Sequence, residues 1–133
     1  MIKVAILDDH QTILDGITYR LNQTQDIVVV AGMLYGEELE ATLAQIEVDV
    51  LILDVQVPTS PENPSPYPIL HLIPKLLQSN SELAILAISM HNQRPLIEAV
   101  LEAGSSGFIL KSDREAITAL AEIVRSAANG DLY

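Results

Sequence analysis

Five short apolar runs alternate with five segments of helical periodicity, and this alternation constrains the fold more than any other feature of the chain. The runs are mostly apolar at consecutive positions, which is typical of strands in a parallel sheet covered on both faces. Right-handed crossovers between such strands give a doubly wound α/β domain. We predict strands at residues 2–7, 27–31, 48–53, 83–88 and 107–110. We predict helices at residues 11–23, 37–46, 69–78 and 95–103, and a last helix that Ser112 or Asp113 caps and that ends near residue 128.

One segment departs from this alternation. Residues 58–68 contain five prolines, and because proline lacks the backbone N–H and fixes φ, we predict a loop there. Pro74 lies inside the helix predicted at residues 69–78, where it favours a kink or a break into two pieces.

The composition limits the class of protein. The chain has 133 residues, which is the size of one domain, and it has no cysteine for a disulfide framework or a thiolate site. Its net charge of −11 repels nucleic acid and anionic lipid and favours cations. No apolar run approaches the roughly 18 residues that span a bilayer, and the start lacks a signal-peptide pattern. We therefore expect a cytoplasmic protein without membrane contact.

Polar residues follow four of the five predicted strands. Parallel strands bring their carboxyl ends to the same edge of a sheet, where open α/β sheets bind ligands. A single aspartate at a strand end is usually a turn residue, but turns alone do not explain five polar residues at one edge. These five residues are Asp8, Asp9, Asp54, Ser89 and Lys111.

This set of side chains indicates metal-assisted phosphoryl chemistry. Three carboxylates need a counter-charge, and oxygen ligands without cysteine favour Mg²⁺ or Mn²⁺. Asp54 is the best candidate nucleophile because it ends a central strand, and Asp8 and Asp9 would hold the metal. Lys111 and Ser89 would contact the phosphoryl oxygens.

The three histidines have weaker claims to a functional role. His10 and His91 follow strand ends at the same edge, but their spacing does not indicate a metal site. We interpret them as loop or helix-start residues, and we interpret His71 as a packed or half-exposed helical residue.

At this point the sequence resembles the receiver (REC) domain of two-component response regulators, over essentially the whole chain. The Asp-Asp-His start, the Gly-Phe-Ile-Leu-Lys block and the late Ala-Asn-Gly-Asp-Leu-Tyr look most like the NarL/FixJ (LuxR-type) subfamily. The resemblance implies a flavodoxin-like, CheY-like (βα)5 fold with strand order 2-1-3-4-5. The segments that carry it are Ile6-Leu7-Asp8-Asp9-His10, Leu51-Ile52-Leu53-Asp54 with Pro58, Ala87-Ile88-Ser89 and Ala103-Gly104-Ser105-Ser106-Gly107-Phe108-Ile109-Leu110-Lys111.

The resemblance also implies a role for each matched residue. Asp54 matches the phosphoacceptor, and Asp8 and Asp9 match the acidic pair that binds Mg²⁺ together with it. Gln56 matches the position whose backbone carbonyl completes the metal site. Lys111 matches the lysine that contacts the phosphoryl group.

Two further matches imply a conformational switch: Ser89 matches the switch hydroxyl and Phe108 the switch aromatic. A sensor histidine kinase would phosphorylate the chain, which would then form a homodimer. The only chemistry expected is self-catalysed phosphoryl acceptance and slow autodephosphorylation. We expect residues 1–128 to be the receiver domain and residues 129–133 to begin a linker to a C-terminal helix-turn-helix domain, absent from this chain, that binds DNA.

The segment after Asp54 departs from the family pattern. The family usually continues with a short Met-Pro-x-x-x-Gly loop, whereas here Val57 precedes Pro58 and the loop is longer, proline-rich and without glycine. The insertion either shapes kinase recognition, or shields Asp54 from hydrolysis, or is a tolerated surface insertion.

Three other functions fit the residues less well. A Mg²⁺-dependent phosphatase of the haloacid-dehalogenase kind needs Asp-x-Asp, and Gln56 replaces its general acid. A dinucleotide-binding domain needs Gly-x-Gly-x-x-Gly after the first strand, where Asp8 and Asp9 stand instead. A pseudo-receiver that works as an unphosphorylated interaction module stays open because of the altered loop.

Overall fold

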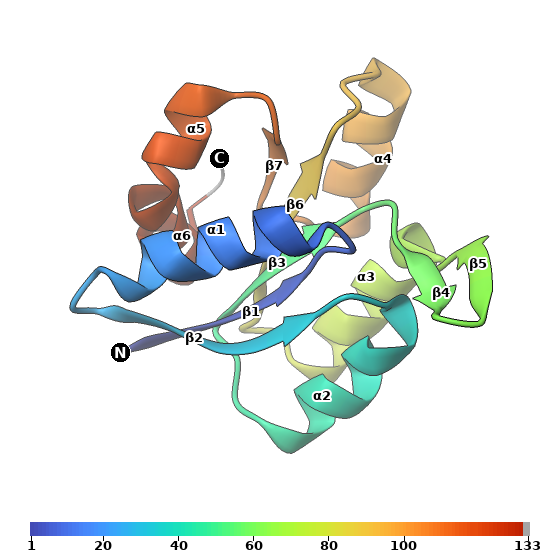
Figure 1. Cartoon of the computed structure of the whole chain (residues 1–133), viewed down its shortest axis with the longest axis horizontal. Coiled ribbons are helices and arrows are strands. Elements are labelled where there is room, and N and C mark those ends of the chain that lie inside the picture. The colour runs from blue at the N-terminus through green and yellow to red at the C-terminus, as the bar shows by residue number, and fades with distance from the viewer. Residues whose placement is uncertain (132–133) are drawn as a thin grey trace.

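A five-stranded parallel sheet forms the centre of the computed structural model, which describes residues 1–131 (Figure 1). Its strand order is β2-β1-β3-β6-β7, which matches the implied order 2-1-3-4-5 because two short strands outside this sheet carry the labels β4 and β5. The strands of the main sheet are β1 (Ile2–Leu7), β2 (Ile27–Met33), β3 (Val50–Asp54), β6 (Ala84–Ser89) and β7 (Gly107–Leu110). The helices are α1 (Gln11–Asn22), the 3₁₀ helix η1 (Gly36–Glu38), α2 (Leu39–Gln45), α3 (Ile69–Ser79), α4 (Arg94–Ala103), α5 (Arg114–Thr118) and α6 (Leu120–Ala128).

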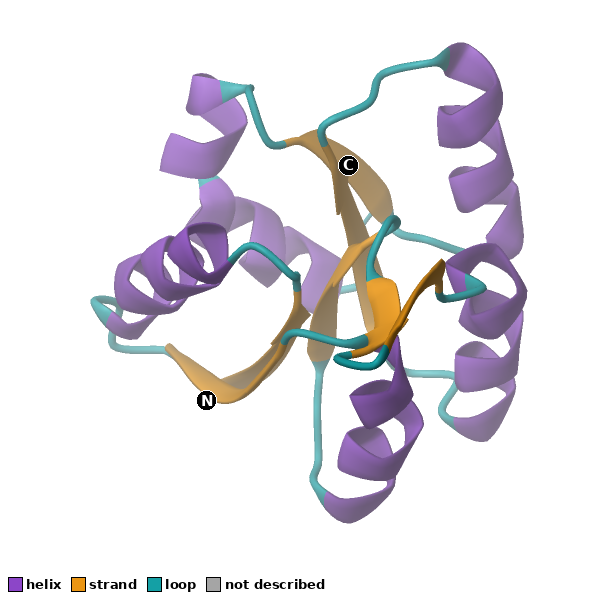
Figure 2. Cartoon of the chain, turned by 45° about the vertical axis from the view of Figure 1, so that its right-hand side comes forward, coloured by secondary structure: helices purple, strands orange, loops and turns teal. Residues whose placement is uncertain are grey.

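The central strands are apolar at consecutive positions because each of their faces packs into a separate core. Val4 and Ile6 of β1 belong to the core shared with α1, α5 and α6, whereas Ala5 and Leu7 belong to the core shared with α2, α3 and α4. All five residues of β3 are buried. Helices lie on both sides of the sheet (Figure 2). Since each large apolar side chain contributes about 1.5–3 kcal/mol on burial, both cores hold the strand ends in place.

The proline-rich segment forms a β-hairpin, so the loop prediction was wrong for residues 58–66. β4 (Pro58–Ser60) and β5 (Asn63–Pro66) pair in antiparallel fashion. A side chain supports the turn between them, since Ser60 Oγ accepts a hydrogen bond from the Asn63 backbone N–H at 3.0 Å. A two-stranded hairpin consists only of edge strands, where the missing N–H of proline costs little.

Tyr67 connects this hairpin to the start of η1. Its backbone N–H donates to the Val57 carbonyl at 2.9 Å and closes the base of the hairpin, and its hydroxyl donates to Glu40 at 3.4 Å. A Cβ atom added to Gly36 would lie 2.1 Å from Cγ of Tyr67. The tyrosine ring therefore lies directly against the Gly36 backbone, where a larger residue does not fit.

Two predicted helices are divided. The segment predicted at residues 37–46 consists of η1 and α2, and the last helix is interrupted at Ala119 between α5 and α6. The interruption is local, because the Ala119 N–H donates to Glu115 O at 2.9 Å and the Ile123 N–H donates to Ala119 O at 3.0 Å. Pro74, by contrast, does not divide α3, which is one helix.

Residues 129–131 follow α6, while residues 132–133 of the predicted linker lie outside the described part of the chain. Within the described part, no helix combines the length and apolar character needed to cross a membrane.

Candidate functional site

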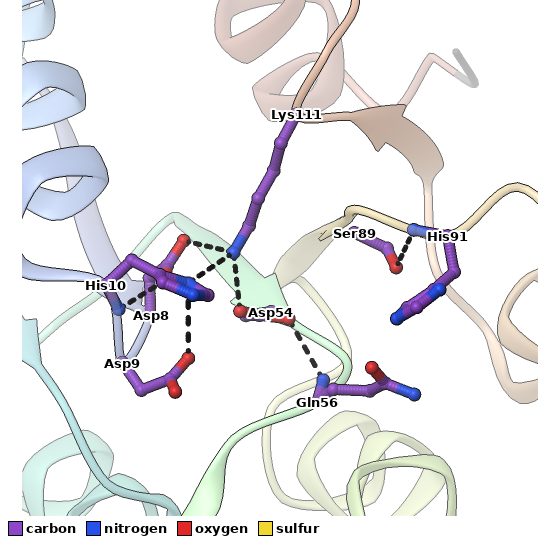
Figure 3. A network of polar contacts seen from close by, with 8 residues as sticks. All are labelled: Asp8, Asp9, His10, Asp54, Gln56, Ser89, His91 and Lys111. Carbon is purple, nitrogen blue, oxygen red and sulfur yellow. Dashed lines mark hydrogen bonds and ion pairs between the residues drawn. The ribbon is translucent and has the colours of Figure 1, made fainter.

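Four neighbouring strands end at one edge of the sheet, and each delivers a polar side chain there (Figure 3). Asp54 and Ser89 are the last residues of β3 and β6, and Asp8 and Lys111 directly follow β1 and β7. These strands are adjacent in the sheet, so residues that are far apart in the sequence converge.

Three of these strand ends share the same local turn. In each, the side chain of the polar residue accepts a hydrogen bond from the backbone N–H two residues further on, as in Asx and Ser/Thr turns. The turn fixes the side-chain position at the point where the strand ends. The pairs are Asp8 with His10 at 2.8 Å, Asp54 with Gln56 at 3.0 Å, and Ser89 with His91 at 2.9 Å.

Lys111 joins two of the carboxylates. Its Nζ donates to Asp54 Oδ2 at 2.7 Å and lies 3.0 Å from Asp8 Oδ2, where the ion pair lacks hydrogen-bond geometry. The side chains of Lys111, Asp54 and Asp8 are 3%, 4% and 0% exposed, so water screens their charges little.

Burial and ion pairing act against each other on these groups. Burial is the largest effect on Asp54 and raises its pKa above the ordinary value, although the Lys111 ammonium and the Gln56 N–H act in the opposite direction. Burial alone would lower the pKa of Lys111, but its contacts with Asp54 and Asp8 outweigh burial and raise it. Lys111 therefore stays charged, and a single ammonium faces two buried carboxylates.

The acidic edge has the properties of a divalent-cation site. Among the described residues, Asp8 Oδ2 and Asp9 Oδ1 are buried oxygen atoms without a hydrogen-bond partner. A buried, unsatisfied carboxylate oxygen is costly, and a hard cation such as Mg²⁺ or Mn²⁺ satisfies it. One ligand atom from each of Asp8, Asp9, His10 and Asp54 lies within 4.8 Å of the others. The predicted carboxylates thus fit the predicted cation.

His10 also belongs to this cluster. The sequence predicted it as a loop or helix-start residue at this edge, which its position as the N-cap of α1 confirms, but did not predict its contacts with the acidic pair. Its Nδ1 lies 3.2 Å from Asp8 Oδ1, 3.5 Å from Asp9 Oδ1 and 3.2 Å from Lys111 Nζ. The available signal was its place directly after the acidic pair, where the strand end that positions Asp8 also positions the next residues.

The other predicted site residues are Ser89, Phe108 and Gln56. Ser89 is 1% exposed, and its hydroxyl hydrogen is free to donate because its oxygen accepts from His91. Phe108 on β7 is partly buried against the core on the side of α2, α3 and α4. Gln56 contacts Asp54 through its N–H, and the role of its carbonyl stays a prediction.

Residues 4–122 match the response regulator receiver domain family, and the chain belongs to this family. The relatives found for it are response regulators of the NarL/FixJ type, so the predicted family and subfamily are confirmed.

Curated relatives match almost the entire chain. The oxygen regulatory protein NreC of Staphylococcus carnosus (strain TM300) is 31% identical over 133 residues, which are 98% of this chain and 57% of NreC. The response regulator GacA of Pseudomonas syringae pv. syringae (strain B728a) is 29% identical over 126 residues, which are 95% of this chain and 53% of GacA. The chain thus spans little more than half the length of these relatives.

Solved structures confirm the fold. The isolated REC domain of RcsB from Salmonella enterica serovar Typhimurium, solved with the phosphomimetic BeF₃⁻, has a TM-score of 0.83 and 26% identity; the match covers 99% of this chain and 91% of that one. The receiver domain of the response regulator NarL from Mycobacterium tuberculosis has a TM-score of 0.82 at 22% identity, with 97% of each chain covered, and supports the fold alone.

Proposed function

We propose that this chain is a phosphorylation-dependent signalling switch in which Asp54 accepts a phosphoryl group from a sensor histidine kinase. The observation that carries this proposal is the contact of the Lys111 ammonium with Asp54 Oδ2 at 2.7 Å, beside the carboxylates of Asp8 and Asp9. An ammonium and an acidic cation site on either side of one carboxylate are the charges that a transferring phosphoryl group needs.

The transfer is an in-line displacement at phosphorus. A carboxylate oxygen of Asp54 attacks the phosphorus of a phosphohistidine, so that a P–O bond forms and the P–N bond breaks. The imidazole nitrogen leaves with the bonding electron pair and takes a proton from water. Lys111 orients the phosphoryl oxygens through its ammonium.

The acidic pair supplies the second half of the charge balance. Asp8, Asp9, Asp54 and the Gln56 carbonyl would hold Mg²⁺ or Mn²⁺, which, when bound, neutralises charge that develops on the phosphoryl oxygens. Asp8 keeps its position because its Oδ1 accepts the His10 N–H, and Asp54 keeps its own through Gln56. Both turns place the carboxylates before any donor arrives, which lowers the cost of orientation.

The aspartyl phosphate changes the local charge and packing. The phosphoryl group adds about −1.5 to −2 charge at neutral pH. The Ser89 hydroxyl donates to a phosphoryl oxygen while it keeps its hydrogen bond from His91, and Phe108 turns inward behind it. These movements reshape the surface of α4, β7 and the last predicted helix, which is α5 with α6, and bias a two-state element.

The output of this switch is homodimerisation and control of a DNA-binding domain in a longer protein. RcsB supports this, because dimers of that protein were solved bound to two parallel DNAs. The net charge of −11 makes direct contact of the present chain with DNA unfavourable. We place this function in the cytoplasm, without enzymatic turnover beyond phosphoryl acceptance and slow autodephosphorylation.

Intact-mass spectrometry after incubation with acetyl phosphate and Mg²⁺ tests the proposal. We expect a single phosphoryl adduct that disappears without the metal and in Asp54→Asn. Asp113→Asn, which alters a carboxylate in the turn before α5, is a control that keeps the adduct. An adduct that persists in Asp54→Asn would overturn the proposal. The absence of an adduct in a folded protein that binds Mg²⁺ would also overturn it, and would favour an unphosphorylated interaction module.

A further inference from the structure

The Nδ1 atom of His10 has more close polar neighbours than one hydrogen bond can satisfy. Nδ1 is 3.2 Å from Asp8 Oδ1 and 3.5 Å from Asp9 Oδ1, both of which are acceptors, and 3.2 Å from the Lys111 ammonium, which is a donor. A single ring nitrogen either donates or accepts, so it does not satisfy both kinds of neighbour. Asp8 Oδ1 already accepts the His10 backbone N–H at 2.8 Å.

These separations are close to those between ligands of one cation. In an octahedral site with metal–ligand distances of about 2.1 Å, neighbouring ligand atoms lie about 3.0 Å apart. The separations of Nδ1 from the two aspartate oxygens, 3.2 Å and 3.5 Å, are near this value. The buried oxygen Asp9 Oδ1 also lacks a hydrogen-bond partner among the described residues, and Asp8 Oδ2 has only the Lys111 ammonium, 3.0 Å away, without hydrogen-bond geometry. A cation bound here would have Nδ1 as one of its ligands and would neutralise the charge of the carboxylate oxygens.

The side chain is free to make this contact. His10 begins α1 as its N-cap residue, but its side chain makes no capping hydrogen bond. The side chain is 55% exposed, so one face of the ring reaches solvent while Nδ1 faces the carboxylates (Figure 3). The backbone alone supports the helix start, because the His10 carbonyl accepts the Leu14 N–H at 3.0 Å.

We propose that His10 Nδ1 is a direct ligand of the divalent cation at this site and makes the site selective for Mn²⁺ and similar transition-metal ions over Mg²⁺. This inference rests on the proposed cation site and adds a nitrogen to its oxygen ligands. Mg²⁺ prefers oxygen ligands and water, whereas imidazole suits transition metals. His10 thereby determines which cation supports the switch.

Pulsed electron paramagnetic resonance of Mn²⁺ bound to the metal-depleted protein tests the proposal directly. We expect a ¹⁴N coupling from the wild-type protein, its loss in His10→Asn and its persistence in His91→Asn. Asparagine is a good N-cap residue, so His10→Asn keeps the start of α1. We expect His10→Asn to weaken Mn²⁺ binding about tenfold, a loss of the size that changes around a metal site cause. Mg²⁺ binding should change less than twofold.

Two results would overturn the proposal. One is Mn²⁺ binding without ¹⁴N coupling, and the other is a coupling that persists in His10→Asn. Labelling the wild-type protein with ¹⁵N-histidine gives the same readout without any variant, because the ¹⁴N coupling must then disappear. The proposed function is judged separately: an Asp54 adduct formed with Mg²⁺ while Mn²⁺ shows no nitrogen coupling refutes the His10 ligand and leaves the switch intact.

Discussion

Two connections leave neighbouring strands at the acidic edge, and they differ in length although they start alike. Between β1 and α1 lie only Asp8, Asp9 and His10, whereas residues 55–68 and a hairpin lie between β3 and α3. At the end of each strand an aspartate, Asp8 or Asp54, accepts the backbone N–H two residues further on. Hydrogen bonds within two residues of each strand end thus fix the two aspartates, and the connections differ only beyond that point.

The long connection, residues 55–68, is held against the rest of the domain. The short connection passes directly into α1, while the long one is held by Tyr67 against Gly36, far from it in the sequence. One connection therefore depends on local hydrogen bonds, and the other on a tertiary contact. Substitutions at the polar network and at the Tyr67 contact should distinguish support by local hydrogen bonds from support by a tertiary contact.

The largest effect is expected at Lys111, whose ammonium contacts both aspartates, Asp8 after β1 and Asp54 at the end of β3. Lys111→Ala leaves the buried carboxylates of Asp8 and Asp54 without a counter-charge, and removal of one partner from a buried ion pair costs about 3–5 kcal/mol. Urea unfolding at pH 7 without divalent cations measures this loss. Lys75→Ala is the matched control, because its side chain is 66% exposed beside Glu40 and should change stability by less than about 0.5 kcal/mol. Equal stabilities of the two variants would contradict the prediction.

Gly36 and Gly16 test the tertiary contact of the long connection. Gly36→Ala places a Cβ 2.1 Å from the Tyr67 ring, and we expect a loss of about 1–3 kcal/mol from overpacking. Gly16→Ala within α1 meets nothing within 4 Å and should gain about 0.5–1 kcal/mol from helix propensity. Thermal unfolding of both variants gives the signs. Tyr67→Ala should relieve Gly36→Ala, and no relief would show that the ring is not the obstacle.

Removal of the hairpin tests whether the site is complete without it. When a short glycine-serine linker replaces residues 59–66, we expect acetyl phosphate still to phosphorylate Asp54, because the turn at Gln56 precedes the hairpin. Mass spectrometry over time gives both the adduct and its half-life. A shorter half-life would identify the hairpin as a shield, and an unchanged one would leave kinase recognition or a tolerated insertion. Loss of the adduct in a folded variant would contradict the prediction.

The smallest effect is expected at the opposite edge of the sheet, where Arg125 donates to both oxygens of Asp26 at 2.6 Å and 2.9 Å. The hydrogen bond from Arg125 lowers the pKa of Asp26 in the folded state below its ordinary value. The ionised form therefore favours the fold above the unfolded pKa of about 3.9, and this contribution is lost as the pH falls through the folded pKa. We expect Asp26→Asn to be slightly less stable than wild type at pH 7 and equal to it in strong acid. If the difference in melting temperature between Asp26→Asn and wild type does not change with pH, the ion pair does not stabilise the fold.

The sequence was most informative where a residue's role depends on strand topology. Asp54 and Lys111 could be predicted as neighbours because parallel strands end at one edge. The hairpin could not be predicted, because five prolines indicate a loop. Proline is tolerated here because β4 and β5 pair only with each other, and the sequence does not show that pairing. The sequence predicted His10 as a loop or helix-start residue at this edge, and it is the N-cap of α1, but spacing along the chain did not show that its ring lies beside Asp8, Asp9 and Lys111. Nothing in the sequence accounts for the interruption at Ala119, since alanine is a strong helix former.

The ion pair between Lys111 and Asp54 joins residues 57 positions apart, and this separation affects how the protein is made. At 5–20 residues per second, a ribosome adds Lys111 roughly 3–11 s after Asp54. During that interval the emerging strands carry the carboxylates without their ammonium. On the proposed function, a nascent chain would become a competent phosphoryl acceptor only after β7 has been synthesised and has paired with β6.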